Sequence, residues 1–161
     1  MNKLMFAIAS LTVAGIGAPA FAADNATATA SVNVITPISV TKTQDLVFGN
    51  ILAGTGGTVV VGTTDNRTFT GGVTLLSGTT AKSAKFDVVA DTTGGASYQM
   101  SYSKVDLTGP GTPIAISAIT PSVTGSQSGN KTIAVGATIT VASGQTPGAY
   151  SGSVTATATY E

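Results

Sequence analysis

Apolar and polar residues alternate with a period of two in many short runs along the chain. The alternation is clearest near the two ends, in A-T-A-T-A-S-V-N-V from residue 26 onwards and in the closing Y-S-G-S-V-T-A-T-A-T-Y-E. Such alternation is typical of β-strands that bury one face and expose the other. It predicts strands over residues 26–34, 38–43, 58–61, 68–76, 84–90, 97–103, 114–119, 132–135, 137–141 and 150–160.

Turn-forming residues separate these runs, as in Gly-Thr-Gly-Gly from Gly54 onwards and in Pro147-Gly148. Glycine supplies positive φ, and proline presets the first position of a turn. Many short strands with such turns, and no amphipathic helix outside the leader, favour an antiparallel β-sandwich or barrel. The glycine pair that begins at Gly71 falls inside the 68–76 run, which indicates a bulge or a break there.

The chain divides into a leader, a short N-terminal segment and one domain. Residues 1–22 combine a cation at Lys3, a mainly apolar run and a small-x-small end, which predicts a cleaved signal peptide and export. Pro37 cannot donate to a strand ladder, so residues 23–36 form a separable N-terminal segment and residues 37–161 the sandwich domain. The sequence predicts no transmembrane segment in the mature chain.

Composition narrows the classes of function. The chain has no Cys, His or Trp, and 9% of its residues are charged, with seven of each sign. Without Cys no disulfide can form, so stability must come from packing and strand hydrogen bonds. A near-neutral surface argues against nucleic acid as a partner, because nucleic acid needs a cationic patch.

Residues that usually carry catalysis or bind metals are scarce. The absence of His and Cys removes the commonest general bases, thiolate nucleophiles and zinc ligands. Apart from Glu161, the carboxylates are aspartates that we expect in turns and at strand ends, namely Asp24, Asp45, Asp65, Asp87, Asp91 and Asp106. We therefore predict that the protein is not an enzyme and has no metal site and no cofactor.

The aromatic residues lie mostly in alternating runs, so we assign them to core packing rather than to a sugar-binding platform. They are Phe48, Phe69, Phe86, Tyr98, Tyr102, Tyr150 and Tyr160.

Two segments carry a resemblance to known families. The C-terminal P-G-A-Y-S-G-S-V-T-A-T-A-T-Y-E resembles the final strand of chaperone–usher pilus subunits, in which the penultimate residue is aromatic, here Tyr160. Residues 34–57, V-I-T-P-I-S-V-T-K-T-Q-D-L-V-F-G-N-I-L-A-G-T-G-G, resemble a bacterial family of secreted domains without assigned function, domain of unknown function 4402. We regard that family as fimbria-like.

The resemblance implies an immunoglobulin-like antiparallel β-sandwich that lacks its last strand. A periplasmic chaperone lends a strand first, and the N-terminal segment of the next subunit then replaces it, with an outer-membrane usher as a further assembly partner. An added strand satisfies both the unpaired backbone groups and the apolar pockets of an open edge. The implied donor residues are Ala26, Ala28, Ala30, Val32 and Val34. The implied acceptor edge consists of Tyr150, Val154, Ala156, Ala158 and Tyr160.

Three functions follow from these observations. The first is a structural subunit of a bacterial fimbria or pilus, exported through the periplasm to the cell surface and polymerising with identical or related subunits. The second is a self-complete secreted sandwich of a surface coat or matrix, in which the N-terminal strand pairs within its own chain. The third is a carbohydrate-binding domain. Alanine at the first three donor positions implies a shallow groove or a weak insertion.

Overall fold

The computed structural model describes residues 24–161. The predicted signal peptide, residues 1–22, lies outside the described residues. The chain forms two units, one that ends at Val32 and one that spans Asn33–Glu161, which we call the body. All strands among the described residues belong to the body, and residues 24–38 form no strand.

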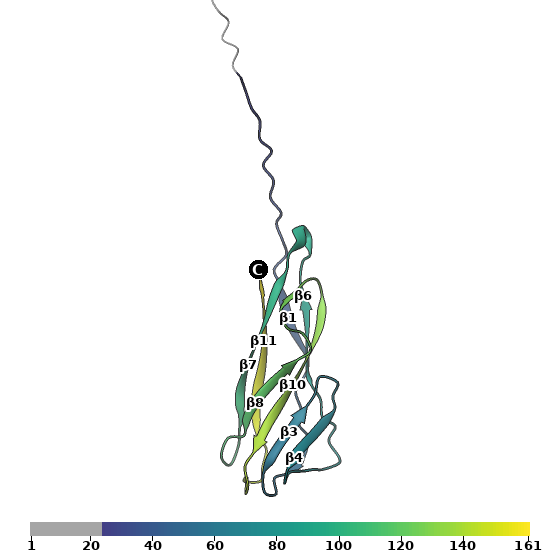
Figure 1. Ribbon diagram of the computed structural model, residues 1–161, viewed down its shortest axis with the longest axis vertical. Helices are drawn as coiled ribbons and strands as arrows, with labels where there is room; N and C mark the ends of the chain where they lie inside the picture. Colours follow the sequence, from purple (N-terminus) through teal and green to yellow (C-terminus); the bar gives the residue numbers. More distant parts are fainter. Residues whose placement is uncertain (1–23) are drawn as a thin grey trace, which may run out of the picture. The chain divides into compact units, whose positions relative to one another are not determined.

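The larger sheet of the body is antiparallel and is built around the long central strand β10 (Figure 1). Its strands follow the order β1-β6-β10-β3-β4, and β8 also pairs with β10. Their bounds are β1 Ser39–Gln44, β3 Gly57–Val61, β4 Arg67–Gly71, β6 Ala84–Val89, β8 Ala115–Pro121 and β10 Lys131–Val141.

Strands β3 and β6 lie end to end along one edge of β10. Val135 pairs with both β6 and β8, and Ala137 pairs with both β3 and β8. Since β8 occupies one edge of β10 at both positions, β3 and β6 must share the other edge. Gly136 lies at the junction, where a Cβ atom would come within 2.3 Å of the Val61 carbonyl oxygen. Glycine is therefore needed at this position of β10, which lies beside the point where the chain leaves β3.

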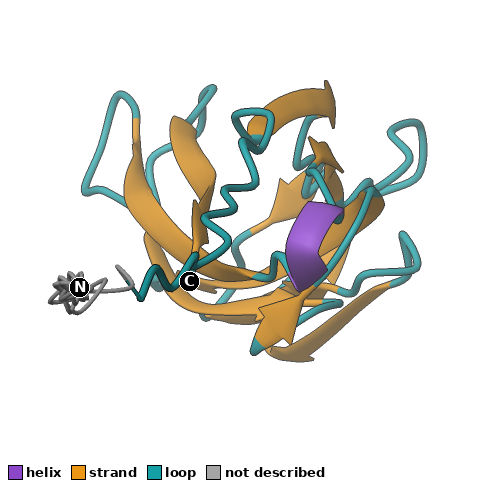
Figure 2. Ribbon diagram, turned by 90° about the horizontal axis from the view of Figure 1, so that it is seen from above, coloured by secondary structure: helices purple, strands orange, loops and turns teal. Residues whose placement is uncertain are grey.

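The smaller sheet has the strand order β11-β7-β9, with β7 at Tyr98–Thr108, β9 at Ser126–Gln127 and β11 at Ser151–Tyr160. Two short strands, β2 (Ile51–Leu52) and β5 (Thr74–Leu75), form a separate pair. The helical content of the described residues is one 3₁₀ turn at Thr93–Gly95, and Figure 2 shows curved strands around a common interior. The predicted all-β antiparallel sandwich is thus confirmed.

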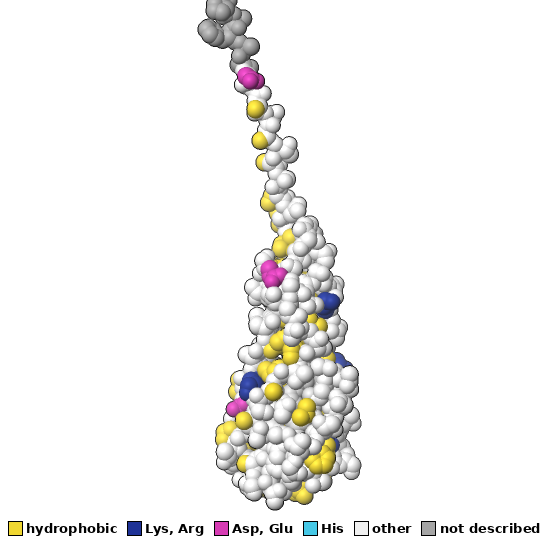
Figure 3. All heavy atoms as spheres, in the orientation of Figure 1, with side chains coloured by type: hydrophobic (Ala, Val, Ile, Leu, Met, Phe, Trp, Pro, Cys, Tyr) yellow, Lys and Arg dark blue, Asp and Glu magenta, His cyan; other side chains and the backbone are white. Residues whose placement is uncertain are grey.

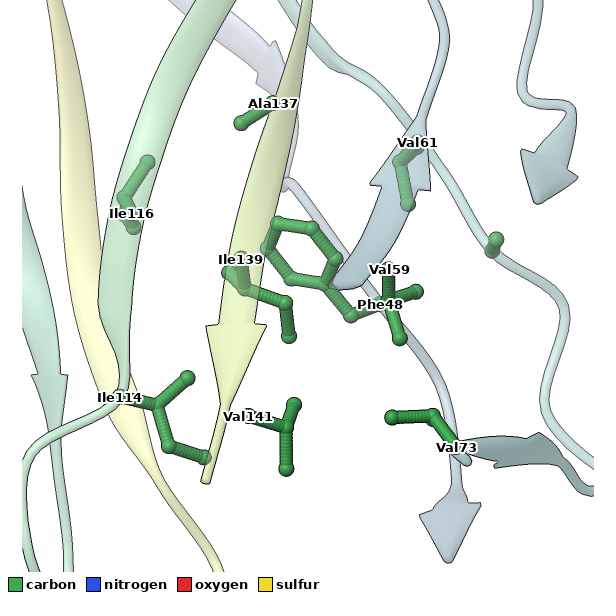
Figure 4. Packing of buried hydrophobic residues seen from close by; sticks show 10 residues of the cluster. Phe48, Val59, Val61, Val73, Ile114, Ile116, Ala137, Ile139 and Val141 are labelled. Carbon is green, nitrogen blue, oxygen red and sulfur yellow. The ribbon is translucent and has the colours of Figure 1, made fainter. Parts of the chain in front are cut away.

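The core between the sheets consists of two clusters. The first gathers Phe48, Val59, Val61, Val73, Ala81, Ile114, Ile116, Ala137, Ile139 and Val141, most of which are seen converging in Figure 4. The second gathers Ala84, Phe86, Val88, Ala90, Tyr98, Met100, Ile133 and Val135. Strand β10 contributes to both clusters, because alternate side chains along its length point between the sheets.

The strands differ from the sequence predictions at several places. The predicted run 68–76 is broken after Gly71 into β4 and β5, as its glycine pair indicated. The predicted strands 132–135 and 137–141 are one continuous strand, since Gly136 accommodates the neighbouring backbone rather than ending the ladder. The two-residue strands β2 and β9 were not predicted. The run 26–34 forms no strand, because a β-strand needs a neighbour to pair with.

The aromatic residues are mostly internal, with one clear exception. Phe48, Phe86 and Tyr98 are buried, whereas Phe69 is 48% exposed. Phe69 pairs with the fully buried Val59, and directly opposite residues of an antiparallel pair face the same side. Because β4 is the outermost strand of its sheet, Phe69 lies at the rim of the core, and its assignment to core packing was wrong.

Candidate functional site

Strands β1 and β11 are edge strands that lie near each other on one side of the sandwich. Within residues 24–161, β11 pairs only with β7, and β1 pairs only with β6. β1 and β11 belong to different sheets that meet at this side, and among the described residues no ladder joins them. Each strand therefore presents backbone N–H and C=O groups that a further strand could pair with.

The inner face of β11 is apolar but only half-buried. Val154, Ala156, Ala158 and Tyr160 point inwards, and the intervening Thr residues are exposed. Val154 packs against both core clusters, while the other three pack against the second. By contrast, alternate residues of the central strand β10 are fully buried. The inner face of β11 thus retains apolar surface that a further strand could cover.

A groove lies beside the start of β11. It consists of two adjoining cavities of about 610 Å³ and about 370 Å³, which share Leu46, Phe48, Leu107 and Tyr150 in their linings. One wall comes from residues 42–54, including the end of β1, and the other from residues 144–154. The floor is formed by core residues such as Ile114 and Ile139. The groove therefore opens directly onto the first core cluster.

The predicted acceptor residues divide into two sets. Tyr150 and Val154 line the groove. Ala156, Ala158 and Tyr160 are not among the lining residues of either cavity and continue β11 beyond it. The sequence analysis did not identify the opposite wall or the floor, because these residues come from segments far apart in the sequence. The one available signal was the apolar pair Leu46 and Phe48 directly after the first strand of the domain.

Tyr150 lies in the wall of the groove just before β11, at the end of that strand that we call the wide end, and its hydroxyl group holds it in place. The hydroxyl donates to the Thr146 carbonyl oxygen at 2.9 Å, and it accepts from the Gly111 N–H at 3.1 Å and from Gln145 Nε2 at 2.8 Å. These bonds satisfy the polar end of the side chain while the ring packs against the first core cluster. The wall formed by residues 144–150 is thereby held in place.

At the other end of β11, hydrogen bonds join Thr36 to Asp91 and Tyr160, and we call this set the Thr36 clamp. The Thr36 N–H donates to Asp91 Oδ2 at 2.9 Å, and the Tyr160 hydroxyl donates to the Thr36 carbonyl oxygen at 3.0 Å. The Tyr160 hydroxyl also accepts from the Asp91 N–H at 2.8 Å. The Thr93 hydroxyl, the Thr36 N–H and the Thr93 N–H all donate to the Asp91 carboxylate and hold its pKa well below the usual range.

The last residue of the chain is also tied to its surroundings. The side chain of Glu161 accepts hydrogen bonds from the hydroxyls of Ser126 and Ser97 and from the amide of Gln99, and these bonds lower its pKa. The Glu161 N–H also donates to the Ser97 carbonyl oxygen at 3.0 Å. The end of β11 is thus fixed against β7 and β9 and does not fray freely.

The predicted donor residues lie in a segment without secondary structure. Residues 24–34 are all exposed, with Val32 at 84% and Val34 at 86%. Figure 3 shows hydrophobic side chains spaced along this segment, separated by polar ones. The first three inward positions of the period-two pattern carry Ala and the last two carry Val, so side-chain size increases towards the body.

Several aspartates of residues 24–161 accept hydrogen bonds from other parts of the body. Asp65 accepts from the Ser83 N–H and hydroxyl, both at 2.7 Å, and Asp106 accepts from the Ile116 N–H at 2.9 Å. Asp87 and Asp106 lie within strands rather than in turns, unlike Asp65 and Asp91. Among residues 24–161, no three side chains of the metal-binding types come together.

In the part of the chain that the structure describes, no helix is long and apolar enough to cross a membrane.

Three comparisons with known proteins gave one match. Neither the curated proteins nor the solved structures gave a match. One family model matches residues 38–160, which include every strand of the body. On that match, the chain belongs to the family described as Domain of unknown function (DUF4402).

Proposed function

We propose that this protein is a structural subunit of a bacterial surface fimbria that polymerises by strand donation. The N-terminal segment of one copy inserts beside β11 of the next copy and completes its sandwich. The observation that carries this proposal is the unpaired edge of β11 over a half-buried apolar face and an open groove. Strand addition at such an edge gains main-chain hydrogen bonds and buries alternate side chains in pockets.

The N-terminal segment has the properties that this edge requires. Residues 26–34 would extend over about 30 Å as a strand, close to the length of about 33 Å for the ten residues of β11. Its apolar side chains recur at every second position, as do those of the inner face of β11. Val32 and Val34 are almost fully exposed in the single chain, so their burial would stabilise an assembled state.

Export to the periplasm and assembly at the cell surface complete the proposal. The predicted signal peptide supplies the export route. An exposed edge strand is a risk for aggregation before assembly, so a periplasmic chaperone that covers β11, and an outer-membrane usher that releases it, are the partners that this chemistry calls for.

Sizing and electron microscopy of purified chains test the proposal. The chain that starts at Ala23 is compared with one that lacks residues 23–34 but retains Thr36 and hence the Thr36 clamp. We expect the longer chain to form fibres as its concentration rises, the shorter chain to remain unassembled, and a peptide of residues 23–36 to bind and stabilise the shorter chain. A peptide with Thr27→Ser, altered on the polar face, is the matched control and should act like the parent peptide.

The self-complete sandwich predicts a different outcome. A longer chain that stays monomeric at every concentration and is unaffected by the peptide would contradict strand donation. Unfolding of the shorter chain alone would then show that the N-terminal segment completes its own body.

A further inference from the structure

The Thr36 clamp fixes the point at which the N-terminal segment joins the body. Both backbone groups of Thr36 are engaged, the N–H by Asp91 and the carbonyl oxygen by the Tyr160 hydroxyl. Thr36 therefore lies beside the last strand residue of β11, at the end opposite to the groove lined by Tyr150 and Val154.

This position decides how a chain could use its own segment. To enter its own groove, the segment would have to reverse direction around Thr36, whose backbone groups the Thr36 clamp already holds. After such a reversal, Val32 and Val34 would lie near Tyr160, at the end of β11 that lines neither cavity. The small residues Ala26 and Ala28 would lie at the wide end.

The sizes of the side chains disfavour that arrangement. The wide end borders the cavities of about 610 Å³ and about 370 Å³, whereas Ala156, Ala158 and Tyr160, towards the other end of β11, line neither cavity. Alanine side chains would leave much of the cavity space unfilled, and unfilled apolar space forfeits packing energy. A segment from a second copy is free to enter in the opposite direction, with Val32 and Val34 at the wide end.

We propose that the Thr36 clamp reserves the groove for a second copy of this chain, with Asp91 and Tyr160 as positioning residues that keep the chain's own segment out. This inference rests on the proposed strand donation. It adds that the donor runs antiparallel to β11 and that its valines fill the wide end of the groove.

Engineered disulfides can report which segment occupies the groove, because the chain has no Cys of its own. Ser153 is exposed on the outer face of β11 near the wide end. Entry of the chain's own segment would bring Thr27 next to Ser153, so the double variant with Thr27→Cys and Ser153→Cys would close a disulfide within one chain. Entry of a second copy would bring Asn33 next to Ser153, so the variant with Asn33→Cys and Ser153→Cys would link two chains.

The two arrangements are well separated in space. Asn33 would lie beside Thr159 if the chain's own segment entered, and beside Ser153 if a second copy entered. These two positions are six residues apart on β11, about 20 Å along the strand. Disulfide formation requires Cα atoms within about 7 Å, so a register shift of two residues does not confuse the two arrangements. Non-reducing gels distinguish a disulfide within a chain from one between chains.

Each double-cysteine chain is made with the intact Thr36 clamp, with Tyr160→Phe and with Asp91→Asn. Tyr102→Phe is the matched control, because it removes a hydroxyl that donates to the Val123 carbonyl oxygen at 2.9 Å, away from Thr36. With the intact clamp and with the control, we expect links between chains through residue 33. With either clamp variant, we expect the ratio of the disulfide within one chain, through residue 27, to the links between chains to rise about fivefold or more. A change of this size corresponds to the loss of one hydrogen bond.

Equal ratios in the clamp variants and the control would overturn the role of Asp91 and Tyr160, while links between chains would still support strand donation. Links between chains through residue 27 would overturn the antiparallel direction. If neither disulfide forms in any variant and the chain stays monomeric, strand donation itself fails, and this inference fails with it.

Discussion

In a single chain, the residues Val32 and Val34 are 84% and 86% exposed, so most of their apolar surface is available for burial in another copy. Changing either valine to Ala removes the equivalent of two CH₂ groups. At about 0.8 kcal/mol per buried CH₂, each change weakens binding by about 1.6 kcal/mol. This corresponds to about 15-fold weaker binding for each change, and to about 200-fold for both if their effects add.

Fluorescence anisotropy measures this effect directly. Labelled peptides of residues 23–36 are titrated with the chain that lacks residues 23–34. The control peptide carries Thr27→Ser on the polar face and should bind within about twofold of the parent, as expected for a conservative exposed change. If the Val32→Ala and Val34→Ala peptides bind as tightly as this control while the parent peptide binds measurably, the valines are not buried in the complex. The reasoning from alternation and exposure would then be refuted.

Three further predictions concern the body. Val154→Asp should lower the free energy of unfolding by at least about 2 kcal/mol in urea titrations, because a carboxylate would enter the half-buried inner face, whereas exposed Thr155→Asp should change it little. Gly136→Ala should cost about 1 to 3 kcal/mol in thermal unfolding, because its Cβ would lie 2.3 Å from the Val61 carbonyl oxygen; an unchanged melting temperature would contradict this close approach. Bonds from Ser83 and Lys85 lower the Asp65 pKa to about 2, so its contribution to stability should be present above pH 4 and disappear as the pH falls through 2. Asp65→Asn should flatten that part of the stability profile.

Local patterns were sufficient to predict the fold class and the direction of side chains along the last strand. The alternation of β11 fixes which residues share a face, because side chains of a strand point to opposite sides in turn. Gly136 shows the limit of such local reasoning. A glycine within an alternating run reads as a break, yet here it permits the close approach of β3, a strand from more than 70 residues earlier in the chain.

The candidate site was only partly predictable for the same reason. Tyr150 and Val154 belong to one predicted run, residues 150–160, and could be assigned together from their spacing. The opposite wall of the groove comes from segments far from β11 in the sequence. The contact of the Tyr160 hydroxyl with Thr36 joins residues that are 124 positions apart. No periodicity records such a contact, because it depends on how the two sheets close and on which strands lie at their edges.

The pairing of β10 with three strands has a consequence for the order of folding. β3, β6 and β8 all precede β10 in the chain, so they are synthesised before the strand that joins them exists. Pairing between distant segments is slow, because the loop between them must first be closed. During that interval the edges of the earlier strands stay open to other chains. The earlier strands are therefore exposed to misassembly from the moment they are made, before β10 and β11 are available to cover them.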